Sequence, residues 1–124
     1  HCREFAMAMV AKSVDCRLLG LDLEKTNRLS ASAIKQVLHP IEAIFTGGDQ
    51  LKASILFSLK EAFYKAQFPK WQAVGNFSDL ALEVDLTKGT AKIREMDARF
   101  SSELMRLRFC FRIVDDYVVS LSWM

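Results

Sequence analysis

Hydrophobic residues recur at intervals of three and four in the first half of the chain and at intervals of two in the second half. The first pattern is typical of amphipathic helices, and the second of strands with one buried face. The change occurs shortly after Pro69. The sequence therefore predicts an α+β protein, with a helical part at 4–68 and a sheet part at about 78–124.

The first predicted helix covers residues Glu4 to Leu19. This segment has no Gly or Pro, and its apolar side chains would cover a wide face of a helix. Gly20 follows in the position where a left-handed residue commonly ends a helix. Residues 21–29 are mixed and charged, and their pattern leaves open whether this connection contains a short strand.

Two or three further helices follow, so the helical part has three or four in all. Ser30 is a good N-cap for a helix whose apolar residues recur at three and four. Pro40 interrupts this pattern, so the helix is either kinked or split in two, with His39 as a boundary residue. Asp49 caps the last helix, which is expected to end before Pro69. Its side opposite the apolar face is predicted to be polar and carries Ser54, Ser58, Glu61 and Lys65.

The sheet part is predicted to be a four-stranded antiparallel meander. Apolar and polar residues alternate from 80 to 86, and Lys88-Gly89 then supplies a two-residue hairpin turn. The alternation changes parity in the next strand, so one extra residue, Arg94 or Glu95, is predicted to form a β-bulge.

The last two strands complete the meander. A second hairpin is expected to close at 101–104. The final hairpin is predicted to have a three-residue loop at 114–116, which turns Tyr117, Val119, Leu121 and Trp123 toward the covered face. A two-residue turn would set arginines opposite Val119 and Trp123, and we disfavour it for that reason. Helices are expected to pack on one face of the sheet and to leave the other open.

Composition supports one folded domain over 1–124. Half of the 124 residues are hydrophobic, and the formal net charge is only +2, which excludes a disordered tail and predicts no nucleic-acid partner. No apolar stretch approaches the length of a membrane span. Because the chain opens with His1 rather than Met, we expect a preceding segment to have been removed, and no localisation is predicted.

No catalytic, metal or cofactor site is predicted. The inward positions of the predicted sheet are apolar, so they offer no acid or base to a cavity beneath the helices. His39 is interpreted as a helix-boundary residue. Cys2, Cys16 and Cys110 lack the spacing of zinc ligands and are interpreted as incidental thiols.

Two surfaces are candidates for binding a protein partner, in a homo- or hetero-oligomer. The first is a row of arginines on the outward sheet face, namely Arg106, Arg108 and Arg112 with Arg94 on the neighbouring strand. Arginine is common at interfaces, although a solvated face would have the same pattern. The second contains Trp71 and Phe77 in a predicted loop, for which packing under the sheet edge is the alternative.

The order of helices, sheet, bulge and terminal hairpin resembles the cone-shaped α+β fold of the nuclear-transport-factor-2-like superfamily. The resemblance covers about 30–123 and is strongest to non-catalytic assembly and adaptor members, which implies a protein-interaction domain of a larger complex. The alternative is a ligand-binding or enzymatic cone with Tyr64, His39 or Tyr117 at the mouth of a pocket. Anion or nucleic-acid binding by the arginine row is a third hypothesis.

Overall fold

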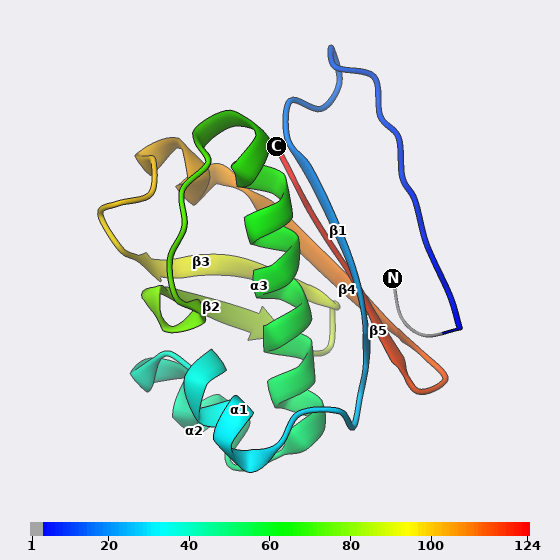
Figure 1. The fold of residues 1–124 in the computed structure, drawn as a ribbon, viewed down its shortest axis with the longest axis vertical. Helices are drawn as coiled ribbons and strands as arrows, with labels where there is room; N and C mark the ends of the chain where they lie inside the picture. The colour runs from blue at the N-terminus through cyan, green and yellow to red at the C-terminus, as the bar shows by residue number, and fades with distance from the viewer. Residues whose placement is uncertain (1–3) are drawn as a thin grey trace.

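The computed structural model describes residues 4–124, in which helices cover one face of an antiparallel sheet (Figure 1). The strand order is β1-β5-β4-β3-β2. The strands are β1 (Leu19–Lys25), β2 (Leu80–Asp85), β3 (Thr90–Met96), β4 (Arg108–Val114) and β5 (Tyr117–Trp123). The helices are α1 (Ala31–Val37), α2 (Ala43–Thr46) and α3 (Gln50–Trp71), with the 3-10 turns η1 (Pro40–Glu42), η2 (Phe77–Asp79) and η3 (Ser102–Arg106). The α+β class and the meander from β2 to β5 are confirmed, but a fifth strand joins the sheet.

The prediction of a helix over residues Glu4 to Leu19 is wrong. Residues 4–18 run beside β1 without a helix, and residues 19–25 form β1, which pairs with β5 at the edge of the sheet (Figure 1). Period-two alternation places leucines on one side of β1 and Gly20, Asp22 and Glu24 on the other. Pairing with β5 therefore decides the conformation that local pattern left open. Cys2 lies outside the described residues.

The helix start signals are confirmed, and one predicted end is wrong. The Ser30 side chain accepts a hydrogen bond from a backbone N–H of the first turn of α1, and Asp49 does the same for α3. His39 caps η1, so its interpretation as a boundary residue is also confirmed. α3 nevertheless passes through Pro69 and ends at Trp71. Pro69 lies in the last turn of α3, where it costs the helix one backbone hydrogen bond, the one to the Lys65 carbonyl.

The predicted bulge is confirmed, whereas two predicted turns are wrong. Arg94 is the extra residue, because its neighbours Ile93 and Glu95 pair with the consecutive residues Leu82 and Ala81. The β2–β3 turn spans four residues rather than two. The 101–104 hairpin is replaced by η3, and β3 pairs with β4 at only two positions. β3 and β4 diverge beyond these pairs (Figure 1).

The final hairpin has the two-residue turn that the sequence argument disfavoured. Val114 pairs with Tyr117, and Arg112 lies opposite Val119. The side chains of β5 that face α3 are therefore Val118, Ser120 and Ser122, all fully buried. Small residues are needed there because α3 lies close to the sheet, as the 2.8 Å hydrogen bond from Ser122 Oγ to the Ala62 carbonyl shows.

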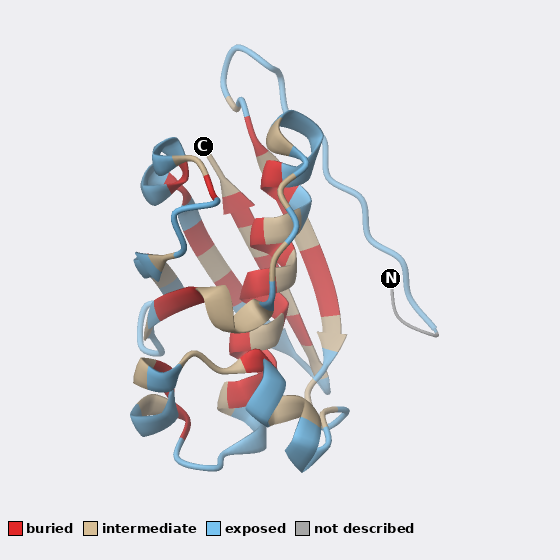
Figure 2. Ribbon diagram, turned by 60° about the vertical axis from the view of Figure 1, so that its left-hand side comes forward, coloured by how far each residue is buried: buried red, intermediate tan, exposed pale blue. Residues whose placement is uncertain are grey.

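The core lies between α3 and the sheet. Figure 2 shows buried residues along α3 and on the strands behind it. Ile55, Leu59 and Phe63 of α3 pack with Phe109 and Phe111 of β4. Among the described residues, no helix is long and apolar enough to cross a membrane.

Candidate active site

The small-residue side of α3 lies directly against β1. Ser54 and Ser58, predicted to lie on the polar side of the helix opposite its apolar face, are buried there. Gly20 makes the approach possible. A Cβ at Gly20 would collide with the Ala62 carbonyl oxygen and lie 2.7 Å from the Ala66 nitrogen. A strand and a helix in such close contact bring their polar side chains within hydrogen-bonding reach.

Asp22 is held between two side chains of α3. Its carboxylate is almost fully buried, and Oδ2 accepts a hydrogen bond from Ser58 Oγ at 2.8 Å. Lys65 Nζ donates to Oδ1 at 2.7 Å, and this lysine is 45% exposed. One oxygen is thus fixed from inside the protein, and the other is paired with a cation that reaches it from the solvent side.

Two further carboxylates lie in the electrostatic field of Asp22. Burial raises the pKa of Glu24 and of Glu61, and the negative charge of Asp22 raises the pKa of both groups further. Lys65 acts in the opposite direction on both. β1 and α3 therefore form an anionic centre, which we define as Asp22, Glu24 and Glu61, with Lys65 as its counter-charge.

A buried hydroxyl next to this centre lacks a partner. Ser120 pairs with Asp22 across the β1–β5 ladder, so both side chains lie on the sheet face covered by α3. Ser120 Oγ is fully buried and has no hydrogen-bond partner among the described residues. Buried polar atoms are rarely left unpaired, so the site has capacity for another polar group or water.

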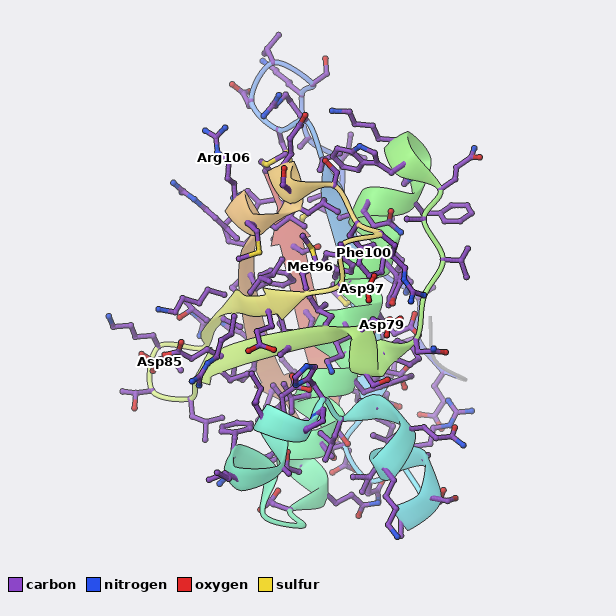
Figure 3. The ribbon with its side chains drawn as sticks, turned by 90° about the vertical axis from the view of Figure 1, so that its left-hand side faces the viewer. Asp79, Asp85, Met96, Asp97, Phe100 and Arg106 are labelled. Carbon is purple, nitrogen blue, oxygen red and sulfur yellow. The ribbon has the colours of Figure 1, made fainter. Side chains whose placement is uncertain are left out.

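The predicted arginine row is only partly present. Arg108 and Arg112 are exposed on the face of β4 turned away from α3. Arg94 is the bulge residue, and Arg106 belongs to η3 instead of a strand. Arg106 points away from the ribbon in Figure 3. The predicted register also puts Val118, Ser120 and Ser122 on this outward face, and this is wrong, since they face α3.

The two predicted loop aromatics belong to regular elements. Trp71 is the last residue of α3, and its half-buried ring lies 4.4 Å from Lys70 Nζ. Phe77 begins η2, and its ring contacts Phe57 and Tyr64. Both therefore have structural contacts within the domain, and their role toward a partner is untested.

The three residues proposed for a pocket mouth lie apart. Tyr117 lines an apolar hollow of about 330 Å³ on the outer sheet face with Phe5 and Met7. His39 lines a separate, mostly polar hollow of about 310 Å³, beside Asp79 and Asp97, which are adjacent in Figure 3. Tyr64 donates a hydrogen bond to the Asn76 carbonyl, and burial raises the pKa of its hydroxyl to about 12.

Sequence reasoning missed the anionic centre altogether. The sequence pattern places Asp22 and Glu24 in a connection of open conformation, and Glu61 and Lys65 on the polar side of a helix, without bringing the two segments together. The missed signal is the alternation of leucines with Gly20, Asp22 and Glu24. This pattern predicts a strand with two carboxylates on one face.

Comparison with known proteins identifies the family. Residues 18–122 match the 4'-phosphopantetheinyl transferase superfamily, and the chain belongs to it. The chain is 32% identical over 100 residues to the 4'-phosphopantetheinyl transferase Svp of Streptomyces mobaraensis. The match covers 76% of this chain and 41% of Svp, so the chain spans about two fifths of the length of that relative.

Solved structures share the fold at low sequence identity. The holo-[acyl-carrier-protein] synthase of Neisseria meningitidis matches with a TM-score of 0.69 and 18% identity, over 87% of this chain and 97% of that one. The Helicobacter pylori enzyme of the same name, in complex with coenzyme A, matches with a TM-score of 0.61 and 19% identity, over 85% and 97% of the two chains.

These findings overturn the functional prediction. The chain belongs to a superfamily of transferases, so the prediction of a non-enzymatic assembly or adaptor domain is wrong. The resemblance to the nuclear-transport-factor-2-like superfamily is wrong as well. The enzymatic alternative fits the findings better, although the residues suggested for it do not form the anionic centre.

Proposed function

We propose that this chain carries the reacting centre of a 4'-phosphopantetheinyl transferase that uses coenzyme A as donor and a carrier protein as acceptor. The superfamily match and the names of the relatives support this activity. The observation that carries it is the anionic centre itself, in which β1 and α3 hold Asp22, Glu24 and Glu61 beside Lys65.

The transfer is a displacement at phosphorus. An acceptor oxygen of the carrier protein forms a new bond to the phosphorus that bears the pantetheinyl group. The bond from that phosphorus to the oxygen of the adenosine-bearing phosphate breaks, and the nucleotide leaves with the electron pair. Such reactions depend mainly on positioning and on stabilisation of charge at the phosphate oxygens.

The residues of the centre suit this chemistry. Lys65 offers a positive charge to phosphate oxygens. Glu61 is half-buried, and its raised pKa makes it a better proton acceptor than an ordinary carboxylate, so it is the candidate base for the acceptor hydroxyl. Asp22 is held in a fixed orientation by Ser58.

Divalent cations support many phosphoryl transfers, and the residues fit one. Carboxylate oxygens are the hard ligands that Mg²⁺ prefers. No three acidic, His or Cys side chains converge as a complete ligand set within residues 4–124. Mg²⁺ does not require such a set, because it is commonly held by one or two carboxylates together with substrate phosphates and water. A bound cation would neutralise charge on the donor phosphates.

The test is a transfer assay with the full-length protein, coenzyme A and an apo acyl carrier protein. We expect the carrier to gain the phosphopantetheinyl group, detected by mass spectrometry. Asp22→Asn and Glu61→Gln should each lower kcat/KM by about 100-fold, since each removes a charge of the centre. Glu103→Gln is the matched control, because Glu103 is exposed and paired with Lys70.

The proposal would be contradicted by a wild-type protein that is folded but leaves the carrier unmodified. Full activity of Asp22→Asn would also contradict it, since the anionic centre would then be dispensable. Loss of activity in the control variant to the same extent would show that the effect does not belong to this centre.

We also propose that Arg108 and Arg112 contact a protein partner. Both are exposed on the sheet face opposite α3, which supports a role outside the anionic centre. Arg94 and Arg106 could extend this surface, but they come from a bulge and a 3-10 turn.

A further inference from the structure

Lys65 occupies the position on Asp22 that a cation would need. The two oxygens of Asp22 are both engaged, one by Ser58 and the other by Lys65. The Ser58 hydroxyl lies between α3 and β1 and is fully buried, so solvent cannot replace it. The Lys65 side chain is 45% exposed, so it can leave Asp22 for water without being buried elsewhere.

The charges around Asp22 and Lys65 favour replacement of the lysine by a divalent cation. Glu24 and Glu61 add negative charge, and with Asp22 they are three carboxylates against the two cations that act on them, Lys65 and Arg28. Ser120 adds an unpaired buried hydroxyl opposite Asp22 in the β1–β5 ladder. Burial of several carboxylates is stabilised by a counter-ion, and a divalent ion brings twice the charge of an ammonium. An ammonium and a divalent cation on the same oxygen would lie within about 4 Å of each other, and like charges at that separation repel, so binding of one disfavours the other.

We propose that Lys65 is an internal competitor that neutralises Asp22 in the absence of metal and must be displaced before a divalent cation binds there. Lys65 is thus a positioning residue with two states, one on Asp22 and one released. This inference rests on the proposed function, because it assumes that the anionic centre takes a divalent cation.

The test measures Mn²⁺ binding by electron paramagnetic resonance, on the full-length protein without coenzyme A or carrier. Lys65→Met should bind Mn²⁺ about tenfold more tightly than wild type, because no hydrogen bond from an ammonium must be broken. Lys65→Arg keeps the charge and should stay within about threefold of wild type. Lys70→Met is the control with the same change of charge on the same helix, and it should change the affinity by less than about twofold.

Three results would overturn the inference. In the first, Lys65→Met binds Mn²⁺ no more tightly than Lys70→Met. In the second, Lys65→Arg gains as much affinity as Lys65→Met, so the ammonium charge is not what competes. In the third, Asp22→Asn binds Mn²⁺ as tightly as wild type, which would also remove the cation from the proposed function. The first two leave the proposed transfer untouched, because that transfer is judged by the carrier assay.

Discussion

Two of the lysines of α3 that form ion pairs with carboxylates, Lys60 and Lys65, differ in almost every other respect. Lys60 and Glu42 are both fully buried. Lys60 also donates to the carbonyls of Val37 and Phe77, while Glu42 accepts from the backbone N–H of Leu82. This pair ties α3 to the ends of α1, η2 and β2.

Lys65 lies five residues further along α3 than Lys60, and its pair with Asp22 is open to solvent. Only the Asp22 side is buried, and the lysine makes no other hydrogen bond that the structure shows among the described residues. The comparison teaches that a pair enclosed on all sides with its hydrogen bonds satisfied acts as a structural tie. A pair with one exposed member beside uncompensated acids can exchange that member.

The largest expected effect is on the buried pair. Lys60→Met should lower the free energy of unfolding by about 3–5 kcal/mol, because it leaves Glu42 charged and buried without its partner. Urea denaturation measures this. The double variant Lys60→Met/Glu42→Leu should recover more than half of the loss, since it removes both charges. A cost below about 1 kcal/mol for the single variant would show that the pair is not a tie.

A smaller effect is expected from Lys65→Met. Without divalent cations it should cost about 2 kcal/mol, the value of a hydrogen bond to a charged group. A saturating cation should restore stability, since a ligand present at about 100 times its Kd adds about 2.7 kcal/mol. The same cation should raise the stability of Lys60→Met by no more than it raises the stability of wild type. Thermal unfolding with and without Mg²⁺ measures both effects. An equal gain in stability for Lys65→Met and Lys60→Met would contradict the proposed difference between the two ion pairs.

The smallest effect belongs to Ser58→Ala. Removing this hydroxyl takes one donor from Asp22 and should cost about 1 kcal/mol in urea denaturation. Ser102→Ala is the control, because Ser102 is exposed, and it should cost less than about 0.5 kcal/mol. Equal costs would mean that Ser58 does not orient the carboxylate.

The helix caps and the bulge could be predicted because their causes are local. Ser30 and Asp49 each bond to a backbone N–H three residues away, so their role needs no distant partner. The extra residue at Arg94 follows from a change of parity within one strand. Neighbouring residues alone contain this information.

The predictions that the structure contradicts failed for a different reason, because distant parts of the chain decide these features. Apolar residues before Gly20 favoured a helix, but residues 4–18 form none, and the N–H groups of Arg17 and Leu18 donate instead to the carbonyl of Met124, just beyond β5. The preference for a large apolar inward face on β5 failed because α3 approaches too closely for it, and Ser122 bonds directly to the helix. Pro69 is a local exception and did not end α3 at once, because a proline in the last turn removes a single backbone hydrogen bond and only Lys70 and Trp71 follow it in the helix.

By itself, the sequence determined the α+β class, the starts of α1 and α3 and the meander of four strands. The tertiary structure alone decided that β1 joins the sheet beside β5, and that α3 rests on it closely enough for Lys65 and Ser58 to reach Asp22. The physical reason is that a site shared by a strand and a helix 36 residues apart depends on the distance between them. That distance is set by packing at Gly20 and Ser122, which no local pattern records.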